Sequence, residues 1–239
     1  MKLNIKKRIK YIIRNLFFSN NNNLGSIKID YNDKPNDLNR LCRKYGCDKG
    51  YFEGFQDFIT WKPHNYTDMY HFLFSCHKIK VKNVFELGIG TNKVFTDRLK
   101  RVSRPGASLR VWRDYFPNAN IYGGDIDPKT MFIEKRIKTF KVDQFSASSI
   151  KKMWRQINRK NFDLIIDDGC HQFEGTINFF SNSINHLSND GYYIIEDVYN
   201  KDKIRFLEYF SQLNYRYYYF DLSNRFNQKD NNLFIIKKL

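Results

Sequence analysis

The sequence lacks the features that mark secreted, disulfide-stapled and membrane-spanning proteins. Only four of its 239 residues are cysteines, and their spacing forms no disulfide framework; Cys42 and Cys47 have no second pair nearby to complete a zinc site. No secretory signal is expected, because Arg14 interrupts the first apolar stretch and no small-residue cleavage site follows it. No apolar run approaches the roughly 18 residues that span a bilayer. We therefore expect a cytoplasmic protein with ordinary thiols.

Acidic residues are too few to balance the basic ones. The chain has 41 Lys and Arg against 25 Asp and Glu, a formal net charge of +16. Six basic residues and no acid stand within residues 1–14, where apolar residues recur at helical spacing. Residues 1–23 are therefore predicted to form a basic amphipathic helix and an asparagine-rich linker. Two roles stay open for this helix: peripheral contact with an anionic inner membrane surface, or packing on the domain or on a partner subunit.

A third glycine is also missing where a dinucleotide-binding loop would need one. Gly88 and Gly90 follow a strand-like run, but the third glycine position is taken by Lys93. Glu86, just before these glycines, would repel a pyrophosphate at the following helix N-terminus. The turn therefore favours a sulfonium or ammonium ligand over NAD, although an ordinary turn with packing glycines stays an alternative.

From residue 80 onward, strand patterns alternate with amphipathic helix patterns. With 41% hydrophobic and 17% aromatic residues, the chain can bury a full core. The polar stretch 223–230 is too short for a packed crossover helix, so the last two strands are predicted to be antiparallel. We predict an α/β fold with a Rossmann-like, seven-stranded, mostly parallel sheet over 81–239, after a helical lead-in over 24–80. The expected strands lie near 83–89, 120–125, 138–143, 162–167, 191–196, 215–221 and 232–237.

Five of these strands end in acid-bearing turns. In an open α/β sheet the ligand crevice lies at the carboxyl ends of the strands, so these acids should share one site. Unopposed carboxylates would repel one another there, and the crevice therefore needs cationic ligands, a metal ion, or both. The acids are Glu86, Asp125, Asp127, Asp143, Asp167, Asp168, Glu196 and Asp197.

These patterns together resemble the class I S-adenosylmethionine-dependent methyltransferases, over about residues 80–239. A closer resemblance, which extends into the lead-in, is to the metal-dependent sugar O-methyltransferases of the mycinamicin and macrocin type. That family usually has serine where this chain has Cys170. The motifs that carry the closer resemblance are Tyr45-Gly46-Cys47-Asp48-Lys49-Gly50, His64-Asn65-Tyr66-Thr67-Asp68-Met69-Tyr70, Pro105-Gly106-Ala107-Ser108-Leu109-Arg110-Val111-Trp112, Asp167-Asp168-Gly169-Cys170-His171 and Glu196-Asp197.

Cofactor roles follow from strand positions and from this resemblance. Gly88 and Gly90 are expected to close over the methionine portion of S-adenosylmethionine, with Glu86 near its ammonium or sulfonium. Asp125 is placed to accept hydrogen bonds from the ribose hydroxyls, with Asp127 as the second candidate.

Further cofactor contacts are expected after the third strand and in the Pro105–Trp112 motif. Asp143, assisted by Gln144, is expected to accept from the adenine amino group; the alternative for Asp143 is an acid at a helix N-terminus near Ser146. The resemblance also implies contacts from Ser108 and Arg110.

The same resemblance implies contacts to cofactor or substrate from Tyr66 and Thr67. Helical spacing leaves plain core packing open for these residues, as it does for Trp112.

The reaction centre is expected after the fourth and fifth strands. Asp168, Glu196 and Asp197 offer the oxygen ligands that Mg²⁺ prefers, and His171 is the candidate general base. Asp167 is expected to orient a metal-bound water or a cofactor group. Each motif alone is also compatible with ordinary turn or capping chemistry. Among the other histidines, only His64 is singled out, because it opens one of the motifs.

We therefore expect a Mg²⁺-dependent O-methyltransferase that acts on a hydroxyl of a sugar, glycan or nucleotide-linked sugar, with homo-oligomerisation implied by the resemblance. Two alternatives stay open. A nucleic-acid methyltransferase is favoured by charge but lacks an Asn/Asp-Pro-Pro-aromatic motif, so nucleic acid is not an expected partner. The other is a basic membrane-associated scaffold that retains a vestigial cofactor fold; stoichiometric cofactor binding together with turnover would exclude it. The acceptor itself is not encoded in any recognisable motif.

Overall fold

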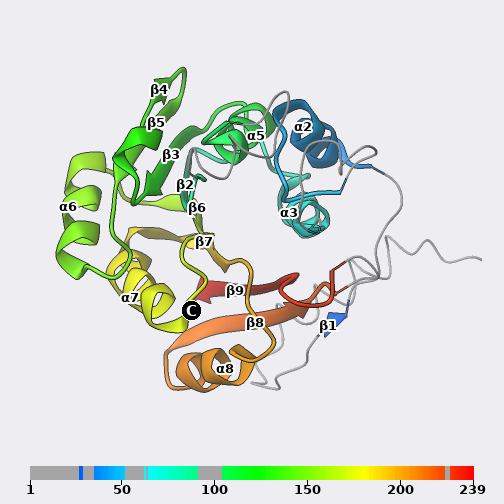
Figure 1. Ribbon diagram of the computed structural model, residues 1–239, viewed down its shortest axis with the longest axis vertical. Coiled ribbons are helices and arrows are strands. Elements are labelled where there is room, and N and C mark those ends of the chain that lie inside the picture. The colour runs from blue at the N-terminus through cyan, green and yellow to red at the C-terminus, as the bar shows by residue number, and fades with distance from the viewer. Residues whose placement is uncertain (1–26, 29–34, 52–61, 63, 91–103, 224–226) are drawn as a thin grey trace, which may run out of the picture.

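The computed structural model describes residues 27–28, 35–51, 62, 64–90, 104–223 and 227–239. The predicted N-terminal basic helix lies outside these residues. Within them one sheet runs through the molecule in the order β1-β8-β9-β7-β6-β2-β3-β5-β4 (Figure 1). Its strands are β1 (Ile27–Lys28), β2 (Asn83–Leu87), β3 (Asn120–Asp125), β4 (Ile133–Glu134), β5 (Ile137–Lys141), β6 (Phe162–Asp167), β7 (Leu187–Ile195), β8 (Tyr215–Asp221) and β9 (Asn232–Lys238).

All seven predicted strands are present, and the predicted fold class is confirmed. The strands β5, β3, β2, β6 and β7 are parallel neighbours, whereas β9 is antiparallel to both β7 and β8. The last strand of the chain therefore enters the sheet between β7 and β8. The two-residue strands β1 and β4 at the sheet edges were not predicted, because two residues carry no periodicity.

Helices cover both faces of the sheet and bury two separate apolar clusters. Figure 1 shows α6, α7 and α8 on one side and α2, α3 and α5 on the other. The first side packs around Phe85, Trp154 and Phe179, and the second around Phe74 and Trp112. The helices are α2 (Asp37–Tyr45), α3 (Tyr66–Phe74), α5 (Ala107–Tyr115), α6 (Ala147–Ile157), α7 (Phe173–Ser183) and α8 (Lys203–Ser211), with short 3-10 turns η2 (Pro128–Thr130) and η3 (Ile184–His186). None of the described helices is long and apolar enough to cross a bilayer.

The lead-in places a loop against the carboxyl edge of the sheet. Helix α2 begins at a capping box, in which Asn39 N donates to the Asn36 side chain and Asn36 N donates to the Asn39 side chain. It ends at Gly46, whose φ of 66° is the left-handed conformation that favours glycine at a helix C-terminus. This turn directs residues 46–50 away from α2 and toward the ends of the central strands.

Strand register brings the predicted acidic turns to one edge. Leu87 at the end of β2 pairs with Gly124 of β3 and with Asp167 of β6, and Asp167 in turn pairs with Ile195 of β7. Because these strands are parallel, their carboxyl ends lie side by side, and the turns that follow them face the same space.

Candidate active site

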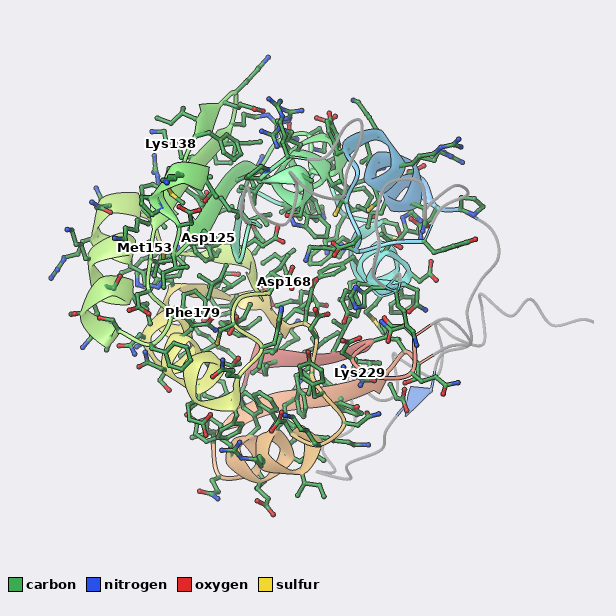
Figure 2. The ribbon with its side chains drawn as sticks, viewed as in Figure 1. Asp125, Lys138, Met153, Asp168, Phe179 and Lys229 are labelled. Atoms are coloured by element: carbon green, nitrogen blue, oxygen red, sulfur yellow. The ribbon has the colours of Figure 1, made fainter. Side chains whose placement is uncertain are left out.

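A cavity of about 410 Å³ opens at the carboxyl edge of the sheet. Its walls come from the turns after β2, β3, β5, β6 and β7, from the start of α5 and from the loop after α2. Figure 2 labels Asp125 and Asp168, which belong to two of these walls. Of the predicted site residues, those that line the cavity are Gly88, Gly90, Ser108, Asp125, Asp143, Gln144, Asp168, His171 and Asp197.

The turn after β2 depends on glycine for two separate reasons. Gly88 and Gly90 have φ values of 83° and 79°, which L side chains rarely adopt. A Cβ on Gly88 would also lie 1.8 Å from the backbone oxygen of Asp168. The turn can therefore approach the β6 turn closely, and the two together form adjoining walls of the cavity.

Replacing Gly88 with alanine is expected to lower the free energy of unfolding by about 3 kcal/mol, since left-handed strain adds to a clash with fixed backbone. Gly106→Ala is the matched control: its φ is 75°, but the added Cβ meets the ring of Phe132, a side chain that can turn. Urea unfolding of both variants measures the difference. Equal losses would show that the approach to Asp168 is not a constraint.

Asp125 is held at the cavity by backbone donors. Ile89 N donates to Asp125 Oδ2 at 3.0 Å, and Asp127 N donates to Asp125 Oδ1 at 3.1 Å. Asp127, the second candidate, instead accepts from Lys129 N at 2.9 Å and caps η2. The geometry thus favours Asp125 over Asp127 as the acid that faces a ligand.

Asp143 and Gln144 line the cavity in different ways. Asp143 is not the cap of α6, because Ser146 is the N-cap residue. The Gln144 amide donates to both Asp167 oxygens at 2.9 Å, and its oxygen accepts from Cys170 N at 2.8 Å. Its polar atoms are therefore engaged within the β6 turn, which differs from the predicted contact with adenine.

Asp167 lies behind this wall rather than on it. It is 2% exposed and is held by Gln144. Burial raises the pKa of Asp167 to about 7, against the opposing effects of Gly169 N, His171 and Gln144. Asp167 accepts from Gly169 N at 3.2 Å as well as from Gln144, and so holds the turn that leads to His171; its expected role in orienting a water or a cofactor group stays a prediction.

Arg110 points away from the cavity, whereas Ser108 lines it. The Arg110 guanidinium lies 2.7 Å from Glu134 Oε1, donates to the Pro105 carbonyl at 2.8 Å and stacks over the Phe132 ring. The partner of Arg110 is thus Glu134 of β4, within the chain itself. Since Glu134 takes up the guanidinium, the structure does not place Arg110 in contact with a cofactor.

Tyr66 and Thr67 at the start of α3 are buried and do not line the cavity. The Thr67 hydroxyl accepts from Asn39 Nδ2 at 3.0 Å, and this contact ties α3 to α2. The Tyr66 hydroxyl donates to Asp197 Oδ1 at 2.6 Å. Their burial agrees with the core-packing alternative, and Tyr66 reaches the site through Asp197; a contact with cofactor or substrate stays a prediction for both residues.

The predicted cation among the acids is supplied by the chain itself. Lys49, in the loop after α2, has a side chain that is 3% exposed, and its ammonium lies 2.6 Å from Asp168 Oδ2 and 3.1 Å from Glu86 Oε1. It also contacts Glu196 Oε2. Burial opposes the charge, but these carboxylates raise the pKa of Lys49 well above its ordinary value. The ammonium therefore stays protonated and partly neutralises the cluster.

Glu86 and Glu196 are buried beneath the cavity wall. Trp112 Nε1 donates to Glu86 Oε2 at 2.6 Å, and the Tyr70 hydroxyl donates to Glu196 Oε1 at 2.6 Å. The other oxygen of each carboxylate contacts the Lys49 ammonium, and neither carboxylate lines the cavity. Glu86 is thus not placed to meet a cofactor ammonium, and Glu196 lies outside the group of candidate metal ligands described next.

Three predicted residues meet at one side of the cavity. One ligand atom each of Asp168, His171 and Asp197 lie within 4.8 Å of one another. His171 Nε2 is 3.6 Å from Asp197 Oδ2 and 4.0 Å from Asp168 Oδ1. His171 and Asp197 both have positive φ, at 52° and 53°, which is uncommon for residues with side chains. Burial raises the pKa of Asp168 to about 6, against the charge of Lys49.

A second set of side chains supports Asp197 from behind. His64 Nε2 lies 3.3 Å from Asp197 Oδ1 and 3.6 Å from Asp230 Oδ1, and its ring stacks on Tyr66 at 4.7 Å. Burial opposes protonation of His64, but the charges of Asp197 and Asp230 raise its pKa to about 9. The motif that begins at His64 points to this residue, whereas no pattern in the sequence points to Lys49 or Asp230, because the sequence does not show which loop side chains turn inward.

The chain is similar in sequence to known methyltransferases. No family model matches the chain. It is 31% identical over 166 residues to a tetracenomycin-C rhamnosyl 3'-O-methyltransferase of Streptomyces olivaceus, covering 70% of this chain and 38% of that protein. It is 32% identical over 166 residues to mycinamicin VI 2''-O-methyltransferase of Micromonospora griseorubida, covering 70% and 37%. The chain thus spans well under half the length of these curated relatives.

A solved structure decides the fold. The MycE methyltransferase of mycinamycin biosynthesis, in complex with Mg, SAH and mycinamycin VI, matches with a TM-score of 0.62 and 24% identity, over 86% of this chain and 55% of that one. This chain has the class I methyltransferase fold. An SAH-bound methyltransferase of Podospora anserina matches all of this chain and 98% of its own at a TM-score of 0.51 and 12% identity. The predicted resemblance of the chain to sugar O-methyltransferases is confirmed by these relatives.

Proposed function

We propose that the protein is an S-adenosylmethionine-dependent O-methyltransferase that works with a divalent cation, expected to be Mg²⁺, on a hydroxyl of a sugar, glycan or nucleotide-linked sugar. One observation carries the proposal: two carboxylates and an imidazole, Asp168, Asp197 and His171, meet at the side of a cavity otherwise built from the glycine turn and the acid after β3. The sugar O-methyltransferases named above support the class of acceptor.

The cavity fits a cofactor with a cationic methionine end and a ribose. Gly88 and Gly90 leave backbone exposed for close approach, and Asp125 offers a carboxylate already oriented by two backbone donors. Asp143 stands on the next strand end, where an adenine ring would lie. S-adenosylmethionine supplies a methyl group already activated by its sulfonium leaving group. The residues of the chain therefore have only to orient the acceptor and remove its proton.

The donor set also fits a hard divalent cation. Asp168 and Asp197 present carboxylate oxygens at the cavity, and Lys49 and His64 hold them from behind. Such an ion would lower the pKa of an acceptor hydroxyl. Glu196, predicted as a third ligand, has both oxygens occupied by Lys49 and Tyr70.

His171 is proposed as the general base. Its ring lines the cavity and its side chain is 29% exposed, so an acceptor can reach it. The charges of Asp168 and Asp197, at 4.0 Å and 3.6 Å from Nε2, would stabilise the imidazolium that forms when His171 takes the hydroxyl proton. The positive φ of His171 turns the side chain back toward these acids.

We also propose that residues 81–239 form the methyltransferase domain and that the lead-in, residues 24–80, completes its site. Gly46, Cys47, Asp48 and Lys49 line the cavity, although they precede the first central strand by more than thirty residues. The lead-in would then be part of the active site rather than a separate module.

S-adenosylhomocysteine is expected to stabilise the protein, and NAD is not. At a hundredfold excess over Kd, a ligand that binds only the folded state adds about 2.7 kcal/mol. The thermal midpoint should therefore rise with S-adenosylhomocysteine in wild type and much less in Asp125→Ala, which removes the proposed ribose acceptor. A rise with NAD alone would overturn the cofactor assignment.

A further inference from the structure

Lys49 is a buried cation to which the proposed methyl transfer assigns no step. It comes from the lead-in, 119 residues before Asp168 and 147 before Glu196. A buried ammonium loses its hydration, and it is stable here only because three carboxylates surround it. This arrangement makes Lys49 part of the electrostatic design of the site.

The three carboxylates around Lys49 are not equivalent. Glu86 and Glu196 each use their second oxygen to accept from a neutral donor, Trp112 and Tyr70 respectively. Asp168 differs, because Oδ2 faces Lys49 whereas Oδ1 faces His171 on the cavity side. Asp168 is therefore shared between the inner ammonium and the outer candidate metal group.

We propose that Lys49 is a positioning residue of the metal centre. Its ammonium pairs with Glu86, with Glu196 and with one oxygen of Asp168. The other oxygen of Asp168 and the carboxylate of Asp197 are then left to bind a single divalent ion. The inference rests on the proposed function, since it concerns the same metal. Two cations that share one carboxylate repel each other, so Lys49 weakens the affinity for the divalent ion while it fixes the place where the ion binds.

The test is direct binding of Mn²⁺ to the full chain, measured from the electron paramagnetic resonance signal of the free ion at about pH 8, above the ordinary range for carboxyl titration. Lys49→Met is expected to bind Mn²⁺ about tenfold more tightly than wild type, which corresponds to about 1.4 kcal/mol. Lys49→Arg keeps the charge and is expected to retain the wild-type affinity. Equal or weaker binding by folded Lys49→Met would overturn the role of Lys49.

Two further variants complete the design. Lys44→Met, five residues earlier, removes a lysine that is 58% exposed and paired with Asp114, and is expected to change nothing. The double variant Lys49→Met with Glu196→Gln removes one charge of each sign, so it should fold even where the single variant does not, and should bind Mn²⁺ with an affinity near that of wild type. Loss of Mn²⁺ binding in the folded double variant would show that Glu196 serves the metal, which contradicts the proposal.

The same data separate this inference from the proposed function. A wild-type chain that binds no Mn²⁺ would remove the metal from the proposed function, and with it the role of Lys49. A wild-type chain that binds Mn²⁺, with Lys49→Met no tighter, would remove only the role of Lys49.

Discussion

Replacing His171 with alanine is expected to lower kcat by about a hundredfold or more, the usual effect of losing a general base. The imidazole is the one nitrogen ligand in the group formed with Asp168 and Asp197. Both carboxylates stay in place in the variant, so the chain should still bind a divalent cation. The expected signature is therefore a large loss of turnover with little change in the Mg²⁺ concentration that gives half-maximal rate.

Steady-state rates across a Mg²⁺ titration measure both quantities. His186→Ala is a suitable control, because His186 stacks on Trp154 and hydrogen-bonds to the Arg159 carbonyl, away from the cavity. This control should retain wild-type kcat. Unaltered turnover in His171→Ala would remove the base from the mechanism.

Replacing Asp168 with alanine is expected to give a different large effect. It removes one of two carboxylates that face the cavity and leaves Asp197 to hold the ion with less charge. Affinity for the divalent cation should fall by about tenfold or more, and the rate lost at low Mg²⁺ should partly recover at high Mg²⁺. The recovery distinguishes Asp168 from His171, for which added metal supplies no proton acceptor.

The same titration tests this expectation, with Asp190→Ala as the control. Asp190 is an exposed acid in β7, outside the cavity lining. Its removal should leave the dependence on Mg²⁺ unchanged. A metal dependence in Asp168→Ala that matches wild type would show that Asp168 does not hold the ion.

The central sheet was predictable because its strands are buried and long enough to show periodicity. β6 contains the apolar run 164–166 and β7 ends in the apolar run 192–195, as buried parallel strands should. The edge strands β1 and β4 were missed, and β4 matters for the site, because Glu134 in β4 holds Arg110. A helical motif alone could not show that this arginine has an internal partner.

The placement of acids was predictable, but their direction was not. Parallel register requires that strand ends share an edge, so a common crevice for Asp125, Asp168 and Asp197 follows from topology. Whether an acid faces the cavity or the core depends on backbone turns, and Glu196 lies inside whereas Asp197, with its positive φ, turns outward.

The partner of the buried acids was missed for a related reason. The expectation that the acids need a cation was sound, but Lys49 lies in a loop that only the folded lead-in brings to the strand ends. Nothing in the spacing of residues 45–50 connects this lysine with Glu86, or with Asp168 and Glu196 more than a hundred positions away. Such long-range ion pairs are decided by tertiary packing rather than by local pattern.

The most direct measurement is methyl transfer from S-adenosylmethionine to a panel of nucleotide sugars and glycosides, followed by mass spectrometry, with Mg²⁺ and with a chelator. At least one acceptor is expected to gain the mass of one methylene unit on a hydroxyl in Mg²⁺, and this product should disappear in chelator. Undiminished product in chelator would contradict the metal centre at Asp168 and Asp197. Tight binding of S-adenosylhomocysteine with no transfer to any glycosidic acceptor would contradict the assignment of a sugar hydroxyl as the substrate.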